Sequence, residues 1–172
     1  MLFVGGFEHP PNVDAIRWYA QAIVPHLRRL LPGVPTYVIG SRVTASVEAL
    51  ASDAIDVLGY VPDMAPYLDG CRVSISPLRY GAGVKGKINT AMSHGLPVVA
   101  TTASIEGMHL TDGVDVLVAD DAEAFAAAIA RVHEDAALWA RLSAAGRENV
   151  ARHFSRAVAR DALSALLARV PS

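Results

Sequence analysis

Hydrophobic and polar positions alternate along the chain in two distinct ways. Short runs rich in Val and Ile are separated by longer stretches in which apolar residues recur at helical spacing, a pattern typical of βαβ units and a parallel sheet. Several of the short runs are almost wholly apolar, as expected for strands that helices cover on both faces. The pattern predicts strands at Leu2–Gly5, Thr36–Ile39, Ile55–Leu58, Val73–Ser76, Pro97–Thr101 and Val114–Val118.

Helices are predicted between these strands and after the last of them. Pro25 has no backbone N–H, so the first helix is expected to break or kink there. Asp121 and Ser155 stand at the N-cap positions of two C-terminal helices. The alanine-rich segment 122–168 is expected to cover one face of the sheet, with a separate helical subdomain as the alternative. The predicted helices are Asn12–Leu31, Val43–Ala51, Pro62–Leu68, Lys87–His94, Ala122–His133, Ala136–His153 and Ser155–Val170.

Length and composition describe one globular domain spanning residues 1–172. With 52% hydrophobic and 19% charged residues the chain is not intrinsically disordered, and no apolar run approaches the ~20 residues that a membrane span requires. The first residues carry no basic region of the kind found in signal peptides. A net charge of −2 lacks the basic character of a nucleic-acid-binding protein. Cys71, the lone cysteine, is expected to be a small buried apolar residue beside a strand.

The predicted fold class is therefore α/β, a Rossmann-like doubly wound parallel sheet of about six strands with helices on both faces. In such sheets ligands bind beyond the carboxyl ends of the strands, so the loops that follow the strands are the candidate sites. Four loops qualify: Gly5–Pro10, Gly59–Asp63, Pro77–Lys87 and Thr102–Gly107.

The third of these loops carries the strongest chemical signal. Three glycines and two lysines lie between a predicted strand and a predicted helix. Glycine lets backbone N–H groups approach an anion closely, the helix N-terminus favours negative charge, and Lys85 or Lys87 adds a full positive charge. The loop is therefore predicted to bind phosphate. In the alternative interpretation the glycines only shape a long loop and both lysines are solvated.

Two familiar phosphate-binding patterns fit this loop incompletely. Residues 81–86 match GxGxxG, but they follow the fourth strand, and the next strand ends without an acidic residue for a ribose, which argues against NAD binding. Residues 81–87 match GxxxxGK, yet Ile88 stands where a P-loop carries the hydroxyl that holds magnesium. No His, Asp or Glu cluster has metal-ligand spacing, so no metal site is predicted. The loop is therefore predicted to bind phosphate groups without binding NAD and without a magnesium site.

The sequence resembles the retaining glycosyltransferases of the group 1 family over essentially its whole length. The run 81–88 followed by 91–101 looks like the family's donor-binding motif, and residues 3–6 and 11–15 resemble the first strand and helix of its C-terminal domain. The segments 58–61 and 115–118 also fall where that domain has similar sequences.

The resemblance implies a GT-B fold, in which two Rossmann-like domains face each other across a cleft, and this chain would be the C-terminal half. The partners implied are a nucleotide-diphosphate sugar donor and the N-terminal domain of the same protein, which would supply most acceptor contacts. No cofactor beyond the donor is expected, and no catalytic residue is assigned. The donor contacts implied are Gly5, Gly6, Tyr60, Val61, Arg79, Gly81, Gly83, Val84, Lys85, Lys87, Asn89, Thr90, Ser104 and Glu106.

The sequence also departs from the family pattern. Ala82 and Thr90 stand where the family has two glutamates, and Gly6 and Asn12 lie near positions that often carry Arg and Lys. These departures leave two other functions open, a non-catalytic nucleotide- or partner-binding module and a nucleotide-sugar epimerase. The expected activity is glycosyl transfer by the whole protein, with the isolated chain inactive. The expected location is the cytoplasm, with peripheral contact to the inner face of the membrane through the missing half as an option.

Overall fold

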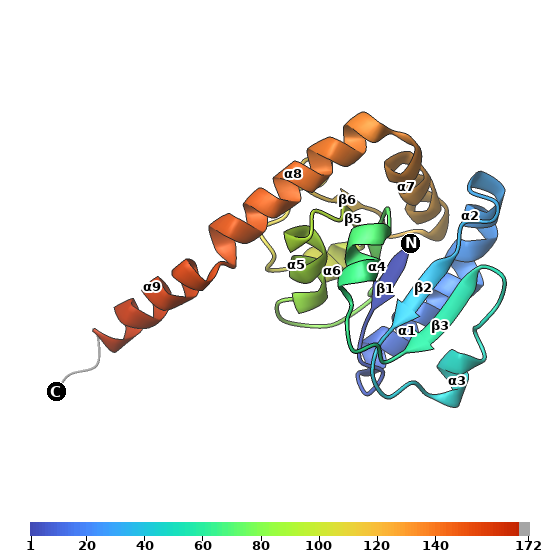
Figure 1. The fold of residues 1–172 in the computed structure, drawn as a ribbon, viewed down its shortest axis with the longest axis horizontal. Coiled ribbons are helices and arrows are strands. Elements are labelled where there is room, and N and C mark those ends of the chain that lie inside the picture. The colour runs from blue at the N-terminus through green and yellow to red at the C-terminus, as the bar shows by residue number, and fades with distance from the viewer. Residues whose placement is uncertain (169–172) are drawn as a thin grey trace.

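The sheet is parallel throughout, with its first strand near the centre. The computed structural model describes residues 1–168. The strands are β1 (Leu2–Val4), β2 (Thr36–Ile39), β3 (Ile55–Gly59), β4 (Ser74–Ser76), β5 (Val98–Ala100) and β6 (Leu117–Val118). They lie in the order β3-β2-β1-β4-β5-β6, and every neighbouring pair is parallel (Figure 1). This is the strand order of a doubly wound Rossmann-like sheet, so the predicted fold class is confirmed.

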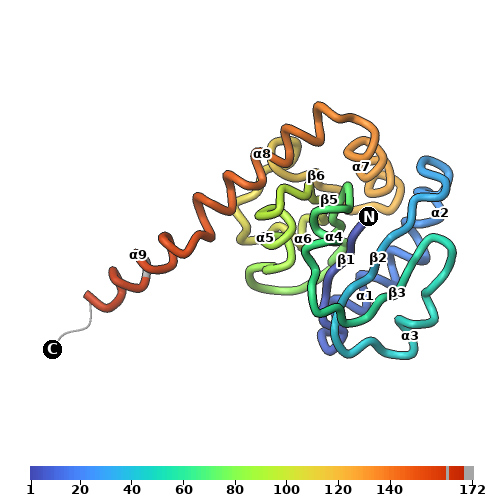
Figure 2. The backbone as a smooth tube through the Cα atoms, viewed as in Figure 1, coloured from blue at the N-terminus to red at the C-terminus, as the bar shows by residue number. Residues whose placement is uncertain are grey.

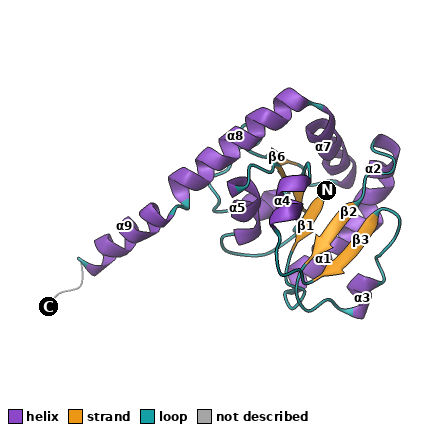
Figure 3. Cartoon of the chain, viewed as in Figure 1, coloured by secondary structure: helices purple, strands orange, loops and turns teal. Residues whose placement is uncertain are grey.

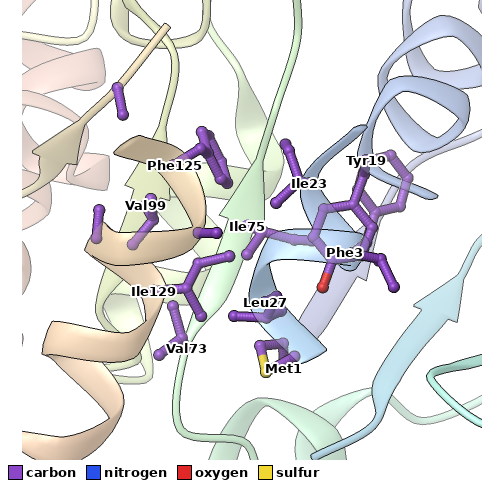
Figure 4. Close-up of a cluster of buried hydrophobic side chains, with 14 of the residues drawn as sticks. Met1, Phe3, Tyr19, Ile23, Leu27, Val73, Ile75, Val99, Phe125 and Ile129 are labelled. Atoms are coloured by element: carbon purple, nitrogen blue, oxygen red, sulfur yellow. The ribbon is translucent and has the colours of Figure 1, made fainter. Parts of the chain in front are cut away.

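Helices cover both faces of this sheet, and each face has its own core (Figure 3). Successive strand residues point to opposite faces, so Phe3 packs into one core and Leu2 into the other. Figure 4 shows the first core, in which Phe3 lies close to Tyr19 and Ile75. The helices are α1 (Pro10–Trp18), a π-helical turn (Tyr19–Ile23), α2 (Val24–Leu30), α3 (Ala45–Glu48), α4 (Ala65–Gly70), α5 (Gly86–Ser93), α6 (Thr102–Ile105), α7 (Ala122–Glu134), α8 (Ala136–His153) and α9 (Arg156–Leu167).

Local structure follows the order of the predicted elements, but several differ in extent; the helix expected at Val43–Ala51, for example, is only the four residues of α3. The predicted break at Pro25 is confirmed, because the chain winds as a π-helical turn before α2 begins. The strand expected at Val114–Val118 is shorter, since Asp115 accepts a hydrogen bond from the backbone N–H of Thr111 and the first half forms a turn. Helix α6 was not predicted.

Helix α9 extends away from the rest of the molecule (Figures 1 and 2). The expectation that the whole alanine-rich segment covers the sheet is correct for α7 but wrong for α9. Ser155 caps α9 at the Val158 N–H, 3.3 Å away, and so starts a new helix immediately after α8. The leucines of α9 are more than half exposed: Leu163, Leu166 and Leu167. Val170, the predicted end of this helix, lies outside the described residues.

Two expectations from composition can be compared with the structure. Cys71 is half-buried next to β4, and burial raises the pKa of its thiol. Its Sγ lies 3.6 Å from the carbonyl oxygen of Met1, so the expected place beside a strand is confirmed, whereas the expected full burial is not. Over residues 1–168, the helices are all too short or too polar to cross a lipid bilayer.

Candidate functional site

A cavity of about 600 Å³ opens where the chain order of the sheet reverses, between the ends of β1 and β4. Strand β1 leads into α1 on one side of this point, and β4 leads through the glycine–lysine loop into α5 on the other. Such reversal points leave a crevice at the carboxyl ends of the strands, where ligands of doubly wound folds bind. The cavity is lined by the β1–α1 loop, the start of α1, part of α4, the β4–α5 loop and the first turn of α5.

Glycine is favoured at two positions in the loops that form this cavity, one of which, Gly83, does not itself line it. Gly83 has a φ of +76°, in the left-handed region that L side chains rarely adopt. At Gly5, a Cβ atom would lie 2.8 Å from Cγ of Asn12, so a larger residue would displace that side chain. The two loops therefore hold shapes that other residues would disturb.

Both lysines of the chain lie at this cavity. Lys85 is the N-cap residue of α5 and is only 7% exposed, and its buried Nζ has no hydrogen-bond partner among residues 1–168. A buried ammonium without a partner is costly, because its hydrogen-bonding capacity and its charge are uncompensated. The free N–H groups at the start of α5 are in the same wall of the cavity and also favour negative charge.

Lys87, in the first turn of the helix, is held by neutral groups. Its Nζ donates a hydrogen bond of 2.6 Å to Oδ1 of Asn12 and lies 4.9 Å from the ring centroid of Phe3. Burial, together with the positive charge of Lys85, lowers the pKa of Lys87 to about 8. The Asn12 amide in turn donates a 2.8 Å hydrogen bond to the carbonyl oxygen of Gly6. Asn12 therefore connects the β1–α1 loop to α5.

A second cavity of about 430 Å³ adjoins the first and shares Val4, Gly5, Gly6 and Met64 with it. Its other wall is the β3–α4 loop, where Tyr60 is 75% exposed and Val61 packs against the core behind. The two cavities together form a space wide enough for an extended ligand that bridges the ends of β1, β3 and β4.

The structure gathers most of the sequence-predicted contacts around these cavities. Gly5 and Gly6 line both, Tyr60 and Val61 line the smaller one, and the larger one contains the lysines and part of the glycine loop. The predicted residues in the larger cavity are Gly5, Gly6, Gly81, Val84, Lys85, Lys87 and Thr90. Ala82 also lines it, and the Thr90 hydroxyl donates to the carbonyl oxygen of Gly86 at 3.0 Å.

Five predicted contacts lie outside both cavities. Arg79 forms a bidentate pair with Asp14, holds the pKa of that carboxyl below its usual range, and lies over the ring of Trp18. Ser104 is fully buried and donates to the carbonyl oxygen of Ser76 at 2.5 Å. The other three are Gly83, Asn89 and Glu106. The assignment of these five, like that of the nine residues that line the cavities, as donor contacts stays a prediction.

Sequence reasoning missed several cavity residues. Asn12 is the one that the sequence could have indicated, because it is a polar amide at the third position of α1, directly after the loop that follows the first strand. His9 and Pro11 also come from that loop and helix start, and Met64 precedes α4. Their spacing in the sequence gives no indication of these contacts.

Chemically, the larger cavity is suited to an anion. It presents two lysines, helix N–H groups and apolar walls, and none of the described residues that line it is acidic. Among residues 1–168 no group of three or more His, Cys, Asp or Glu side chains is arranged to hold a metal ion. The site is therefore built for electrostatic binding by fixed donors.

Comparison with known proteins identifies the family of this chain. Residues 1–135 match the family model described as glycosyl transferases group 1. The chain belongs to this family. A curated relative, an uncharacterised 44.6 kDa protein in the cps region of Klebsiella pneumoniae, is 28% identical over 73% of this chain and 35% of its own length.

Solved structures confirm the fold of this group 1 chain. HepE from Anabaena, in complex with UDP, superposes with a TM-score of 0.79 at 16% identity, covering 98% of this chain and 48% of HepE. The C-terminal domain of the group 1 glycosyl transferase LpcC from Francisella tularensis gives 0.73 at 13% identity, covering 90% of this chain and 86% of that domain. The chain thus spans about a third of the curated relative and about half of HepE.

Proposed function

We propose that this chain is the donor-binding domain of a glycosyltransferase and holds the diphosphate of a nucleotide-sugar donor in the larger cavity. The observation that carries the proposal is the buried, unpartnered Nζ of Lys85 beside the Lys87 ammonium and the N-terminus of α5. A diphosphate would give this ammonium its missing partner. The group 1 family membership and the UDP in the HepE complex support the same ligand class.

The cavity also suits the charge changes of glycosyl transfer. When the bond between the anomeric carbon and the diphosphate oxygen breaks, the electron pair stays on the leaving diphosphate, and the acceptor oxygen forms the new bond and loses its proton. Lys85, Lys87 and the α5 amides can stabilise that increasing negative charge. In an enzyme of another kind, removing one hydrogen-bond donor that stabilises such a charge lowers the reaction rate about 10²–10³-fold.

The remaining parts of the donor have matching surroundings. The smaller cavity, with Tyr60 and Val61, would take the nucleobase, because it is adjacent to the diphosphate site and partly apolar. The acceptor would be bound by an N-terminal domain of the same protein. We place the whole enzyme in the cytoplasm, with peripheral contact to the inner membrane face through that domain, and it needs no cofactor beyond the donor.

A non-catalytic nucleotide-binding module is the second candidate function. Ala82 and Thr90 line the cavity where the family pattern has glutamates, and the Thr90 hydroxyl is already bonded to Gly86. A module of this kind would bind nucleotide diphosphates without transferring sugar.

Calorimetric titration of this chain with UDP, GDP and ADP tests the binding proposal. We expect a dissociation constant below millimolar for one of them, and at least a hundredfold loss in the double variant Lys85→Ala, Lys87→Ala. Arg131→Ala, an exposed cation on α7, is the matched control and should bind as the parent does. No binding to any of the three, or undiminished binding by the double variant, contradicts the proposal. Sugar transfer by the full-length protein separates an enzyme from a binding module.

A further inference from the structure

The ammonium of Lys87 is buried among groups that do not neutralise it. Its hydrogen-bond acceptor is the uncharged amide oxygen of Asn12, and its nearest ring is Phe3 on β1. The positive charge of Lys85 repels the Lys87 ammonium and so lowers the pKa of Lys87 further. His9, on the β1–α1 loop, lines the same cavity and is also unable to supply negative charge.

The carboxylates on neighbouring elements have other partners. Asp14 on α1 is paired with Arg79, and Glu8 on the β1–α1 loop faces the hydroxyl of Ser41. Asp63, before α4, accepts a 2.9 Å hydrogen bond from the Ala65 N–H. Lys87 is thus a buried cation whose described surroundings supply only neutral or positive groups, and its pKa of about 8 has this physical cause.

An anion in the cavity would reverse this situation. A diphosphate next to Lys87 favours the charged form of the amine, so its pKa would rise on binding. Linkage then requires that the ligand binds more tightly to the protein whose amine is protonated, and that binding takes up protons wherever the free amine is partly deprotonated.

We propose, on the basis of the function proposed above, that a diphosphate enters this cavity together with a proton that Lys87 takes from solvent, and that Asn12 is the positioning residue that directs this amine toward the ligand. The coupling depends on the neutrality of Asn12. A carboxylate at the same position would keep Lys87 permanently charged and would itself repel the diphosphate. The neutral amide orients the amine through a 2.6 Å hydrogen bond and leaves its charge free to respond to the ligand.

Proton uptake is measurable by calorimetry with UDP at pH 8.0 in two buffers of different ionisation enthalpy. The phosphate of UDP is ionised at this pH, since phosphate ester groups have a second pKa near 6. We expect uptake of about half a proton per UDP bound, because a group with a pKa of about 8 is half protonated at pH 8. Between pH 7 and pH 9 the dissociation constant should rise about tenfold.

Two variants separate the coupling from a general loss of binding. Lys87→Arg carries a charge that does not titrate, so uptake should fall below about a tenth of a proton at any UDP concentration that gives measurable binding. Asn12→Asp should do the same and should weaken binding about tenfold, whereas Asn12→Ala should keep the uptake while weakening binding. An Asn12→Asp variant with full uptake would show that Asn12 has only a structural role.

The lysine content of the chain allows a direct measurement in the intact protein. Lys85 and Lys87 are the two lysines of the sequence, so lysine-selective ¹³C labelling gives two side-chain signals, and Lys87→Arg assigns them. We expect one titration midpoint near pH 8 in the free protein and above 10 with UDP bound. Binding of UDP without proton uptake, or with an unchanged midpoint, overturns this inference alone. Failure to bind UDP, GDP and ADP overturns the proposed function as well.

Discussion

Lys87 couples the stability of the protein to pH through its burial. In the unfolded chain its pKa is about 10.4, and in the folded protein it is about 8, so between these values the unfolded state holds more protons. Stability therefore rises with pH across this window. At pH below 8 the buried charge costs the folded state its full penalty, which by linkage is at most about 3 kcal/mol.

The expected result is an unfolding free energy that increases from pH 8 to pH 10 relative to the variant Lys87→Met, which lacks the titrating group. Urea denaturation at several pH values measures both proteins, and Arg131→Ala again serves as the control. Parallel pH profiles for the parent and Lys87→Met would contradict the buried-amine interpretation.

At the same scale, the sequence indicates residue types but not their contacts. The glycines and both lysines of the β4–α5 loop were identifiable, because strand, loop and helix follow each other in order and the chemistry depends on composition. The contact between Asn12 and Lys87 joins residues 75 positions apart, and it depends on β1 and β4 being neighbours in the sheet, which brings the starts of α1 and α5 together. Arg79 could equally have faced the cavity; only its pairing with Asp14 turns it away.

Among the elements, α7 and α8 meet at a corner made by one residue. The Asp135 backbone N–H closes the end of α7 on the carbonyl oxygen of Arg131, while its side chain accepts 2.9 Å hydrogen bonds from the N–H groups of Ala137 and Leu138. A single carboxylate thus ends one helix and begins the next.

Replacing Asp135 by Ala should cost about 1 kcal/mol of unfolding free energy, within the 0.5–2 kcal/mol typical of N-caps, because two backbone donors lose their acceptor. Asp135→Asn keeps an oxygen in place and should cost less. Urea denaturation distinguishes them, with the exposed neighbour Glu134→Ala expected within about 0.5 kcal/mol of the parent. Equal stability of Asp135→Ala and the parent would argue against the cap.

The elements that could be predicted from the sequence were those whose apolar residues recur at regular helical or strand spacing. Helix α8 occupies the predicted range Ala136–His153, and the caps at Asp121 and Ser155 are both confirmed. The π-helical turn and α6 escaped prediction for physical reasons. A single π-helical turn shifts the apolar spacing by only about one residue, which the loose helical pattern of a sequence does not reveal. Helix α6 has a single turn, which starts where the Thr101 hydroxyl accepts a hydrogen bond from the Ser104 N–H.

The whole molecule consists of a closed α/β body and the extended helix α9 (Figure 2). The apolar side chains of α9 contribute little to the stability of the body, since the leucines of this helix are largely exposed. Isolated helices of this length are marginal in water, so α9 should melt independently of the body. The helical spacing of apolar residues predicts α9 itself. It does not predict where α9 packs, because an amphipathic pattern does not identify the surface that the helix faces.

Deleting residues 156–172 should therefore leave the unfolding free energy of the body within about 0.5 kcal/mol of the full chain. Far-ultraviolet circular dichroism should show only the loss of this helix. Leu142→Ala, at a buried position of α8, is the positive control and should cost about 2–5 kcal/mol. A loss above about 2 kcal/mol on deletion would mean that α9 stabilises the body.

The central place of β1 also determines when the sheet can close during synthesis. Leu2 pairs with Tyr37 on one side and with Ser74 on the other, so the second side of β1 stays open until about 70 further residues have been made. At ~5–20 residues per second a ribosome needs roughly 4–14 s for that stretch. During this interval an apolar strand edge is exposed, and the nascent domain depends on its β1–β2 half, or on a chaperone, to keep that edge from pairing with another chain.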